Sequence, residues 1–148
     1  MTEVAENHEK IRVLFSMAGT PLPKHELTET LISSIYNDEE ASIVSTSFSK
    51  IREYLTVDQI SEKSGVKDKD RLKKMLDHMV YIGSLMQKDS TYYIMSYLPG
   101  IFETYFTAVR DTREIGGSRR LELAGKAHRG LRKINFRPGK QFPLVPPV

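Results

Sequence analysis

Lysine and arginine side chains gather in the middle of the sequence and again near its end. Each carries a positive charge that could neutralise a phosphate, and an arginine could also bond the edge of a guanine. The residues that could contact nucleic acid in this way are Lys67, Lys69, Arg71, Lys73, Lys74, Lys88, Arg119 and Arg120. Asp68, Asp70 and Asp77 lie on the same predicted helix as the first five and would repel phosphate, so a solvated face of mixed charge is the competing interpretation.

The charge is distributed unevenly along the chain. Residues 109–148 hold ten Lys/Arg and three Asp/Glu, a net charge of +7, whereas the 12 basic and 16 acidic residues before them give −4. The basic segment could meet nucleic acid, an acidic partner or another part of a larger protein. The competing interpretation is a solvated basic segment, or one that docks on the acidic body of the chain or on a missing domain.

The residue types that support catalysis are sparse. The sequence has no cysteine, which removes disulfides, thiol nucleophiles, zinc ribbons and cysteine-bound clusters from this chain. The four histidines stand far apart and match no metal-binding or nucleophile motif. We therefore expect no enzyme activity, no catalytic residues and no metal or cofactor site within these residues.

The same composition predicts a cytoplasmic setting. Disulfide bonds belong to oxidising compartments, and this sequence cannot form any. No apolar run approaches the roughly 18 residues of a spanning helix, so we expect no contact with a membrane. The polar, acidic start of the chain predicts that there is no signal peptide.

The clearest local signals lie between residues 54 and 96. Thr56 and Gln59 have the spacing of a helix-capping box, and Gly65 is the expected left-handed end of that helix. A longer helix is predicted from residue 67 to about residue 82, followed by β-prone runs at 84–87 and 92–96 that form a hairpin. This order is typical of a winged helix-turn-helix, whose second helix enters the major groove when it binds DNA.

The predicted fold class is mainly α with a small β-hairpin (α+β), a winged helix-turn-helix with extra N-terminal helices and a helical, basic C-terminal extension. Apolar spacing predicts helices over residues 1–17 and 26–36, with Asp38 capping a third. Pro99 is expected at the start of a further helix with an aromatic face, and a basic helix is expected over 119–133. The predicted organisation is an N-terminal helix or tail at 1–20, a winged-helix domain at 21–110, and a basic helical extension with a proline-rich tail at 111–148.

A short motif, Leu98-Pro99-Gly100-Ile101-Phe102-Glu103, follows the predicted hairpin. Upstream, Pro21-Leu22-Pro23-Lys24 leads into a helix, and Asn37-Asp38-Glu39-Glu40-Ala41 opens the next. Together these features resemble the N-terminal region of prokaryotic 4Fe-4S ferredoxin-type iron–sulfur proteins, over about residues 21–106. The resemblance implies a winged-helix-like domain that precedes a cysteine-rich, cluster-binding part.

The resemblance implies a non-catalytic module that serves domain or protein contacts in an electron-transfer protein. Its partner would be a downstream iron–sulfur domain or a separate redox protein. Because this chain has no cysteine, no cluster ligand transfers to it, and 4Fe-4S clusters are expected only in a missing downstream part. The proline-rich end fits a chain cut inside a linker. A DNA-binding winged-helix transcriptional regulator is the alternative function.

Overall fold

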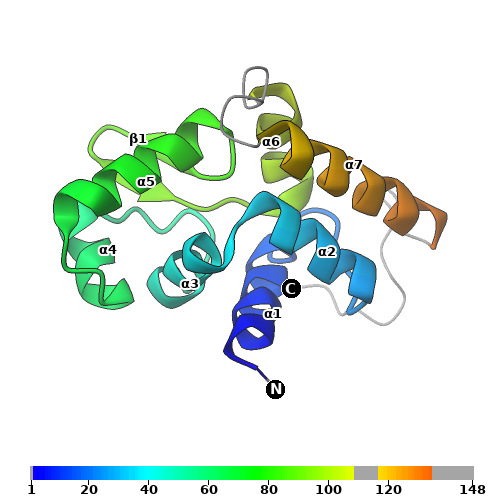
Figure 1. Cartoon of the computed structure of the whole chain (residues 1–148), viewed down its shortest axis with the longest axis horizontal. Helices are drawn as coiled ribbons and strands as arrows, with labels where there is room; N and C mark the ends of the chain where they lie inside the picture. Colours follow the sequence, from blue (N-terminus) through cyan, green and yellow to red (C-terminus); the bar gives the residue numbers. More distant parts are fainter. Residues whose placement is uncertain (1, 109–116, 135–148) are drawn as a thin grey trace.

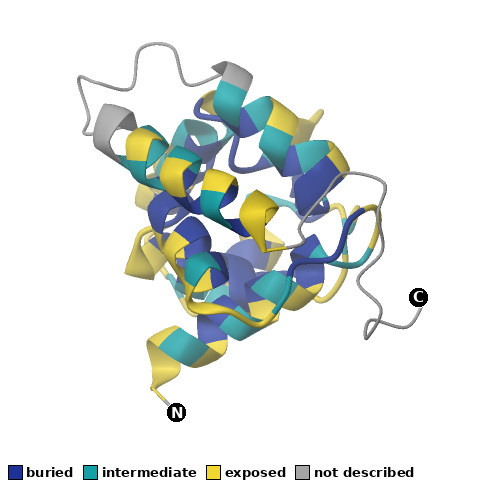
Figure 2. Ribbon diagram, turned by 90° about the vertical axis from the view of Figure 1, so that its right-hand side faces the viewer, coloured by how far each residue is buried: buried dark blue, intermediate teal, exposed yellow. Residues whose placement is uncertain are grey.

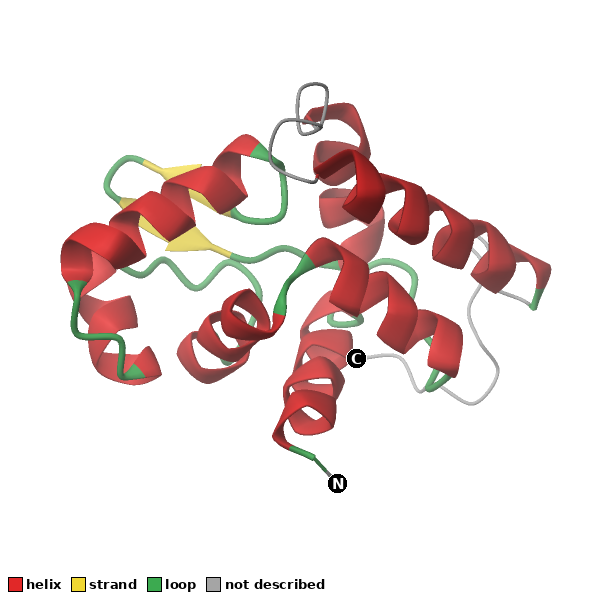
Figure 3. Ribbon diagram, viewed as in Figure 1, coloured by secondary structure: helices red, strands yellow, loops and turns green. Residues whose placement is uncertain are grey.

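The computed structural model describes residues 2–108 and 117–134. Over these residues the protein is mainly helical with one small antiparallel sheet (Figures 1 and 3), which confirms the predicted α+β class. In the view of Figure 1, helices α4 and α5 and the hairpin form the left-hand end, and α1, α2 and α7 fill the centre and right.

Three helices come first along the chain: α1 (Glu3–Phe15), α2 (Glu26–Ile35) and α3 (Asp38–Ser47). Helix α1 packs against both of the others. Apolar side chains recur at helical spacing on each, so one side of every helix can be buried. Figure 2 shows this division between buried and exposed sides. The fully buried residues include Ile11, Phe15, Leu31, Ile35 and Val44.

The cap of α3 differs from the prediction. Asn37, and not Asp38, is the N-cap: its side-chain oxygen accepts a hydrogen bond from Glu40 N, and Glu40 Oε1 accepts one from Asn37 N, both at 2.8 Å. Asparagine and aspartate are comparable N-caps. The glutamate three residues after Asn37 closes a capping box and decides between them. Asp38 becomes the first helical residue, where its charge favours the positive end of the helix dipole.

The local signals around α4 (Val57–Ser64) are confirmed. Thr56 N donates to Gln59 Oε1 at 2.8 Å, and Gln59 N donates to Thr56 Oγ1 at 3.2 Å, which is the predicted capping box. Gly65 ends the helix with a left-handed φ of 79°. Residues 65–68 then lead into the next helix.

Helix α5 (Lys69–Tyr81) begins after Asp68, whose carboxylate accepts a hydrogen bond from Arg71 N at 3.1 Å. One side of the helix is buried through Leu72, Leu76 and Met79. The other side carries the charged residues and stays exposed. The helix therefore packs through its apolar stripe and presents its charges outward.

The hairpin consists of β1 (Met86–Lys88) and β2 (Thr91–Tyr93), with Gln87 opposite Tyr92. Each strand is shorter than the predicted run. Leu55 adds a bridge to the free side of β2: Leu55 N donates to Tyr92 O at 2.9 Å, and Tyr92 N donates to Leu55 O at 2.7 Å. The segment that precedes α4 therefore lies beside the hairpin.

The prediction that Pro99 begins a helix is wrong. The segment Tyr97–Ile101 (η1) is irregular, and the helix starts at Phe102, as α6 (Phe102–Ala108). Pro99 has an extended ψ of 150° and Gly100 a φ of 139°. A glycine directly after the proline lets the chain turn before it becomes helical. The Glu103 carboxylate then accepts a hydrogen bond from Gly100 N at 3.1 Å.

The basic helix predicted over 119–133 is present as α7 (Gly117–Lys133) and lies alongside α2 (Figure 1). Ala124, Ala127 and Leu131 are buried. Gly130 permits a close approach, since a Cβ atom there would lie 2.9 Å from Leu27 Cδ1. Part of the basic segment is thus packed on the body of the protein. The predicted proline-rich end falls outside the described residues.

Candidate functional site

The structure distributes the predicted nucleic-acid contacts over several elements. Lys67 precedes α5, Lys88 is on β1, and Arg120 is on α7. Arg119 is also on α7, but its side chain is outside the described part of the structure. The cations carried by α5 itself, all of them exposed, are Lys69, Arg71, Lys73 and Lys74.

Two cations near the start of α5 are engaged by carboxylates from other helices. Lys69 Nζ lies 3.0 Å from Asp58 Oδ1, on α4. Arg71 Nη2 donates to both carboxylate oxygens of Glu39, on α3, at 2.6 and 2.5 Å. This hydrogen bond and the charge of Glu39 raise the pKa of Arg71. The guanidinium is therefore directed to the protein's own carboxylate and not to an external anion.

Asp77 engages a third cation and ties α5 to the hairpin. Lys73 Nζ donates to Asp77 Oδ2 at 2.7 Å, and the Tyr92 hydroxyl donates to Asp77 Oδ1. Burial acts against ionisation of Asp77, but these two hydrogen bonds lower its pKa overall. Burial and the hydrogen bond to Asp77 raise the pKa of Tyr92 to about 12. Three of the four cations on α5 are thus paired, while neither Lys67 nor Lys74 forms an ion pair with a described residue.

Arg120 is engaged inside the fold. Its Nη1 donates to Glu40 Oε1 at 3.1 Å, and the Glu40 side chain is only 5% exposed. The same carboxylate oxygen accepts from Asn37 N in the cap of α3. Arg120 therefore links α7 to the start of α3 and compensates a buried charge.

Replacing this arginine tests that structural role. Arg120→Met is expected to lower the free energy of unfolding by about 2 kcal/mol, because it leaves the Glu40 carboxylate buried without its cation. Arg129→Met, an exposed change on the same helix, is the control and is expected to stay within about 0.5 kcal/mol of the wild type. Urea unfolding followed by circular dichroism measures both. Equal stability of the two variants would contradict the role assigned to Arg120.

A buried aromatic cluster joins α7 to the segment after the hairpin. His128 Nδ1 lies 2.9 Å from the Tyr97 hydroxyl, and its ring stacks on Phe102 with centroids 4.4 Å apart. Burial, together with the charges of Arg132 and Arg129, lowers the pKa of His128 to about 4. At neutral pH a neutral imidazole fits this apolar setting, so the cluster supports packing of α7.

Several hollows lie beside α1. One, of about 560 Å³, runs between α1 and the end of α3 and is lined in part by Val13, Leu14 and Phe48. Another, of about 410 Å³, lies between α1 and the start of α2. Within residues 2–108 and 117–134, no group of three or more histidine and carboxylate side chains could hold a metal ion.

Sequence reasoning identified the cations but not what they bind. Glu39 is 32 residues from Arg71, and no periodicity relates the two. Asp77 was identified as a neighbour of opposite charge, and its i,i+4 spacing from Lys73 is a readable signal. The aromatic pair Tyr54–Tyr93 was missed, with ring centroids 4.9 Å apart, because it depends on the pairing of Leu55 with Tyr92.

Comparison with known proteins adds no relative: neither a family model, nor a curated protein, nor a solved structure matches the chain. Within the described part of the chain, none of the helices combines the length and apolar character needed to cross a membrane.

Proposed function

We propose that this chain is a non-catalytic winged-helix module that makes protein or domain contacts. The order of elements supports the winged-helix interpretation: α3, the Leu55 bridge, α4, a glycine turn, α5 and the hairpin follow one another. A cytoplasmic setting, expected from the lack of cysteine, is part of the same proposal.

The observation that carries the proposal is the pairing of the cations on α5. A helix that reads DNA needs free cations toward the phosphates and free donors toward the bases. Here Lys69, Arg71 and Lys73 face carboxylates of the protein itself. Such a charge-balanced surface would release few counterions on duplex DNA and is better matched by a protein surface with complementary charges.

The iron–sulfur context rests on the resemblance of Leu98–Glu103 and its upstream motifs alone. A 4Fe-4S cluster does not fit the residues of this chain, which has no cysteine ligand to offer. The proposed partner is therefore an iron–sulfur domain on the same polypeptide or a separate redox protein. Anaerobic purification of the native gene product, followed by visible absorption, tests this context: we expect cluster absorption, and a colourless product would refute it.

The alternative function is a DNA-binding regulator, and the winged-helix order of elements favours it. Fluorescence anisotropy with duplex DNA at about 50 and about 200 mM salt separates the two functions. We expect weak binding at low salt that is lost at the higher concentration. Binding that survives higher salt and disappears in the Lys69→Ala/Arg71→Ala/Lys73→Ala variant would establish the regulator instead.

Glu39→Gln examines the pairing directly. Removing this carboxylate frees Arg71 and adds one unit of positive charge, so the low-salt affinity for duplex DNA is expected to rise about threefold to tenfold. The double variant Glu39→Gln/Arg71→Ala is the matched control and should return the affinity to the wild-type value. If Glu39→Gln binds DNA no better than the wild type, the Glu39 carboxylate does not prevent Arg71 from contacting DNA.

A further inference from the structure

The outer face of the hairpin carries two tyrosines side by side. Leu55 and Tyr92 pair and are buried, so their neighbours Tyr54 and Tyr93 point to the opposite face of the sheet. The two rings meet edge to face with centroids 4.9 Å apart, and Tyr54 is 45% exposed. Met86 lies opposite Tyr93 in the register. We call Tyr54, Tyr93, Met86 and Lys88 the tyrosine face.

One cation lies over the tyrosine face, and two more are exposed on the segment that leads to Tyr54. Lys88 Nζ lies 5.4 Å from the centroid of the Tyr54 ring. Arg52 is exposed and held beside the sheet by a hydrogen bond from its N to Ile94 O at 2.9 Å, and Lys50, also exposed, precedes it by two residues. None of these three cations forms an ion pair with a described carboxylate, in contrast to the paired cations of α5.

Two acidic residues, Glu53 and Asp89, are neighbours in sequence of Tyr54 and Lys88. Glu53 is directed to other partners, since its carboxylate accepts from Ser49 N at 2.9 Å and lies 3.4 Å from Lys63 Nζ. Asp89 lies in the hairpin turn with a φ of 54°. The exposed Tyr54 ring therefore has a lysine over it and two further exposed cations shortly before it in the chain.

We propose that the tyrosine face binds a single-stranded nucleic acid. An unpaired base can stack on the exposed Tyr54 ring, and Lys88, Arg52 and Lys50 can neutralise the flanking phosphates. Lys88 does not block the Tyr54 ring, because its flexible, solvated side chain can move aside when a base stacks on the ring. Stacking and phosphate contacts are common to RNA and DNA, so strands of both kinds are expected to bind.

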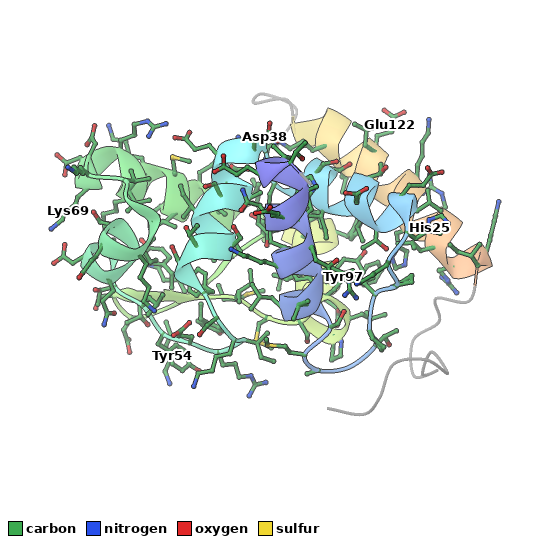
Figure 4. The ribbon with its side chains drawn as sticks, turned by 90° about the horizontal axis from the view of Figure 1, so that it is seen from below. His25, Asp38, Tyr54, Lys69, Tyr97 and Glu122 are labelled. Atoms are coloured by element: carbon green, nitrogen blue, oxygen red, sulfur yellow. The ribbon has the colours of Figure 1, made fainter. Side chains whose placement is uncertain are left out.

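A duplex does not fit this site, because its bases are already stacked on one another. An acidic protein segment could satisfy the three cations but offers no planar ring to stack on Tyr54. The tyrosine face also lies on elements other than the exposed side of α5, and Figure 4 shows Tyr54 and Lys69 at separate places on the surface. This inference therefore goes beyond the proposed protein-contact function and does not depend on it.

The test uses the full chain with labelled oligo(dT) and oligo(rU) of about 15 nucleotides, a length within the site sizes of such surfaces. Anisotropy gives the affinity, and quenching of tyrosine fluorescence reports stacking, since the chain has no tryptophan to mask it. Tyr54→Leu keeps the apolar bulk of the side chain but removes the ring. We expect it to weaken binding by about tenfold or more and to abolish the quenching.

Tyr81→Leu is the matched control. Tyr81 is 56% exposed at the end of α5, so this variant removes an equally accessible ring elsewhere and is expected to bind as the wild type does. Lys88→Gln should weaken binding several-fold and reduce its salt dependence.

Four outcomes would overturn the proposal. The first is unchanged affinity and quenching in Tyr54→Leu. The second is an equal loss in Tyr81→Leu. The third is polyglutamate that binds as tightly as the oligonucleotides and competes with them, which would assign the face to an acidic protein partner. Absence of binding by either oligonucleotide at about 50 mM salt would refute it as well.

Discussion

Gly83→Ala is expected to lower the free energy of unfolding by about 3–5 kcal/mol. Gly83 ends α5 with a φ of +83°, and a Cβ atom there would lie 2.3 Å from Thr104 O and 2.8 Å from Tyr105 N. These are backbone atoms of α6, which no change of rotamer can move aside. The left-handed conformation costs about 1 kcal/mol for alanine, and overpacking against backbone adds about 2–4 kcal/mol.

Gly65→Ala is the matched control for that variant. Gly65 has nearly the same φ, +79°, but a Cβ atom there would meet nothing within 4 Å. We expect this variant to lose only about 1 kcal/mol. Urea unfolding of both proteins separates the two contributions. Both variants carry the strain of an alanine at positive φ, so the difference between their losses reports the close packing at Gly83. Equal losses in the two variants would show that α6 does not lie against the end of α5 as described.

Acidification is expected to destabilise the protein through His128 by up to about 3 kcal/mol. Burial lowers the folded-state pKa of His128 to about 4, from an ordinary value of 6.5. As the pH falls below about 6.5, the unfolded chain binds a proton that the folded protein excludes, so stability decreases. Below about pH 4 the folded protein binds the proton too, and this loss stops growing.

Urea unfolding across this pH range, on the wild type and on His128→Gln, isolates that effect. The other groups that titrate are common to both chains, so the difference between their stabilities reports the histidine. We expect the difference in the free energy of unfolding between the two proteins to be constant above about pH 6.5 and to change steadily as the pH falls from there to about 4. A constant difference over the whole range would mean that His128 is not held neutral between Tyr97 and Phe102.

The parts of the fold that the sequence predicted are those governed by a few neighbouring residues. The capping box of Thr56 and Gln59, the left-handed Gly65 and the hairpin after α5 all depend on contacts between residues close together in sequence, at most as far apart as Met86 and Tyr93. Pro99 shows where such local reasoning fails: its ring suits a helix start, but the next residue, Gly100, allows another turn first.

The candidate site was harder to predict because its properties come from pairs distant in sequence. The sequence displayed Arg71 as a cation beside an aspartate-rich run, and its partner proved to be Glu39 on another helix. Likewise, Tyr54 and Tyr93 become neighbours only once Leu55 pairs with Tyr92. The sequence thus shows which charged and aromatic residues are present. Contacts between helices and strands distant in sequence decide which of these side chains are free to bind a ligand.

The packing of α7 on α2 has a consequence for how the protein is made. Leu27 and Gly130 meet across this contact although about a hundred positions separate them in the chain. A ribosome adds roughly 5–20 residues per second. For some seconds, therefore, α2 is outside the ribosome before the helix that covers it has been synthesised. During that interval its uncovered apolar side is a place where a chaperone can bind a nascent chain.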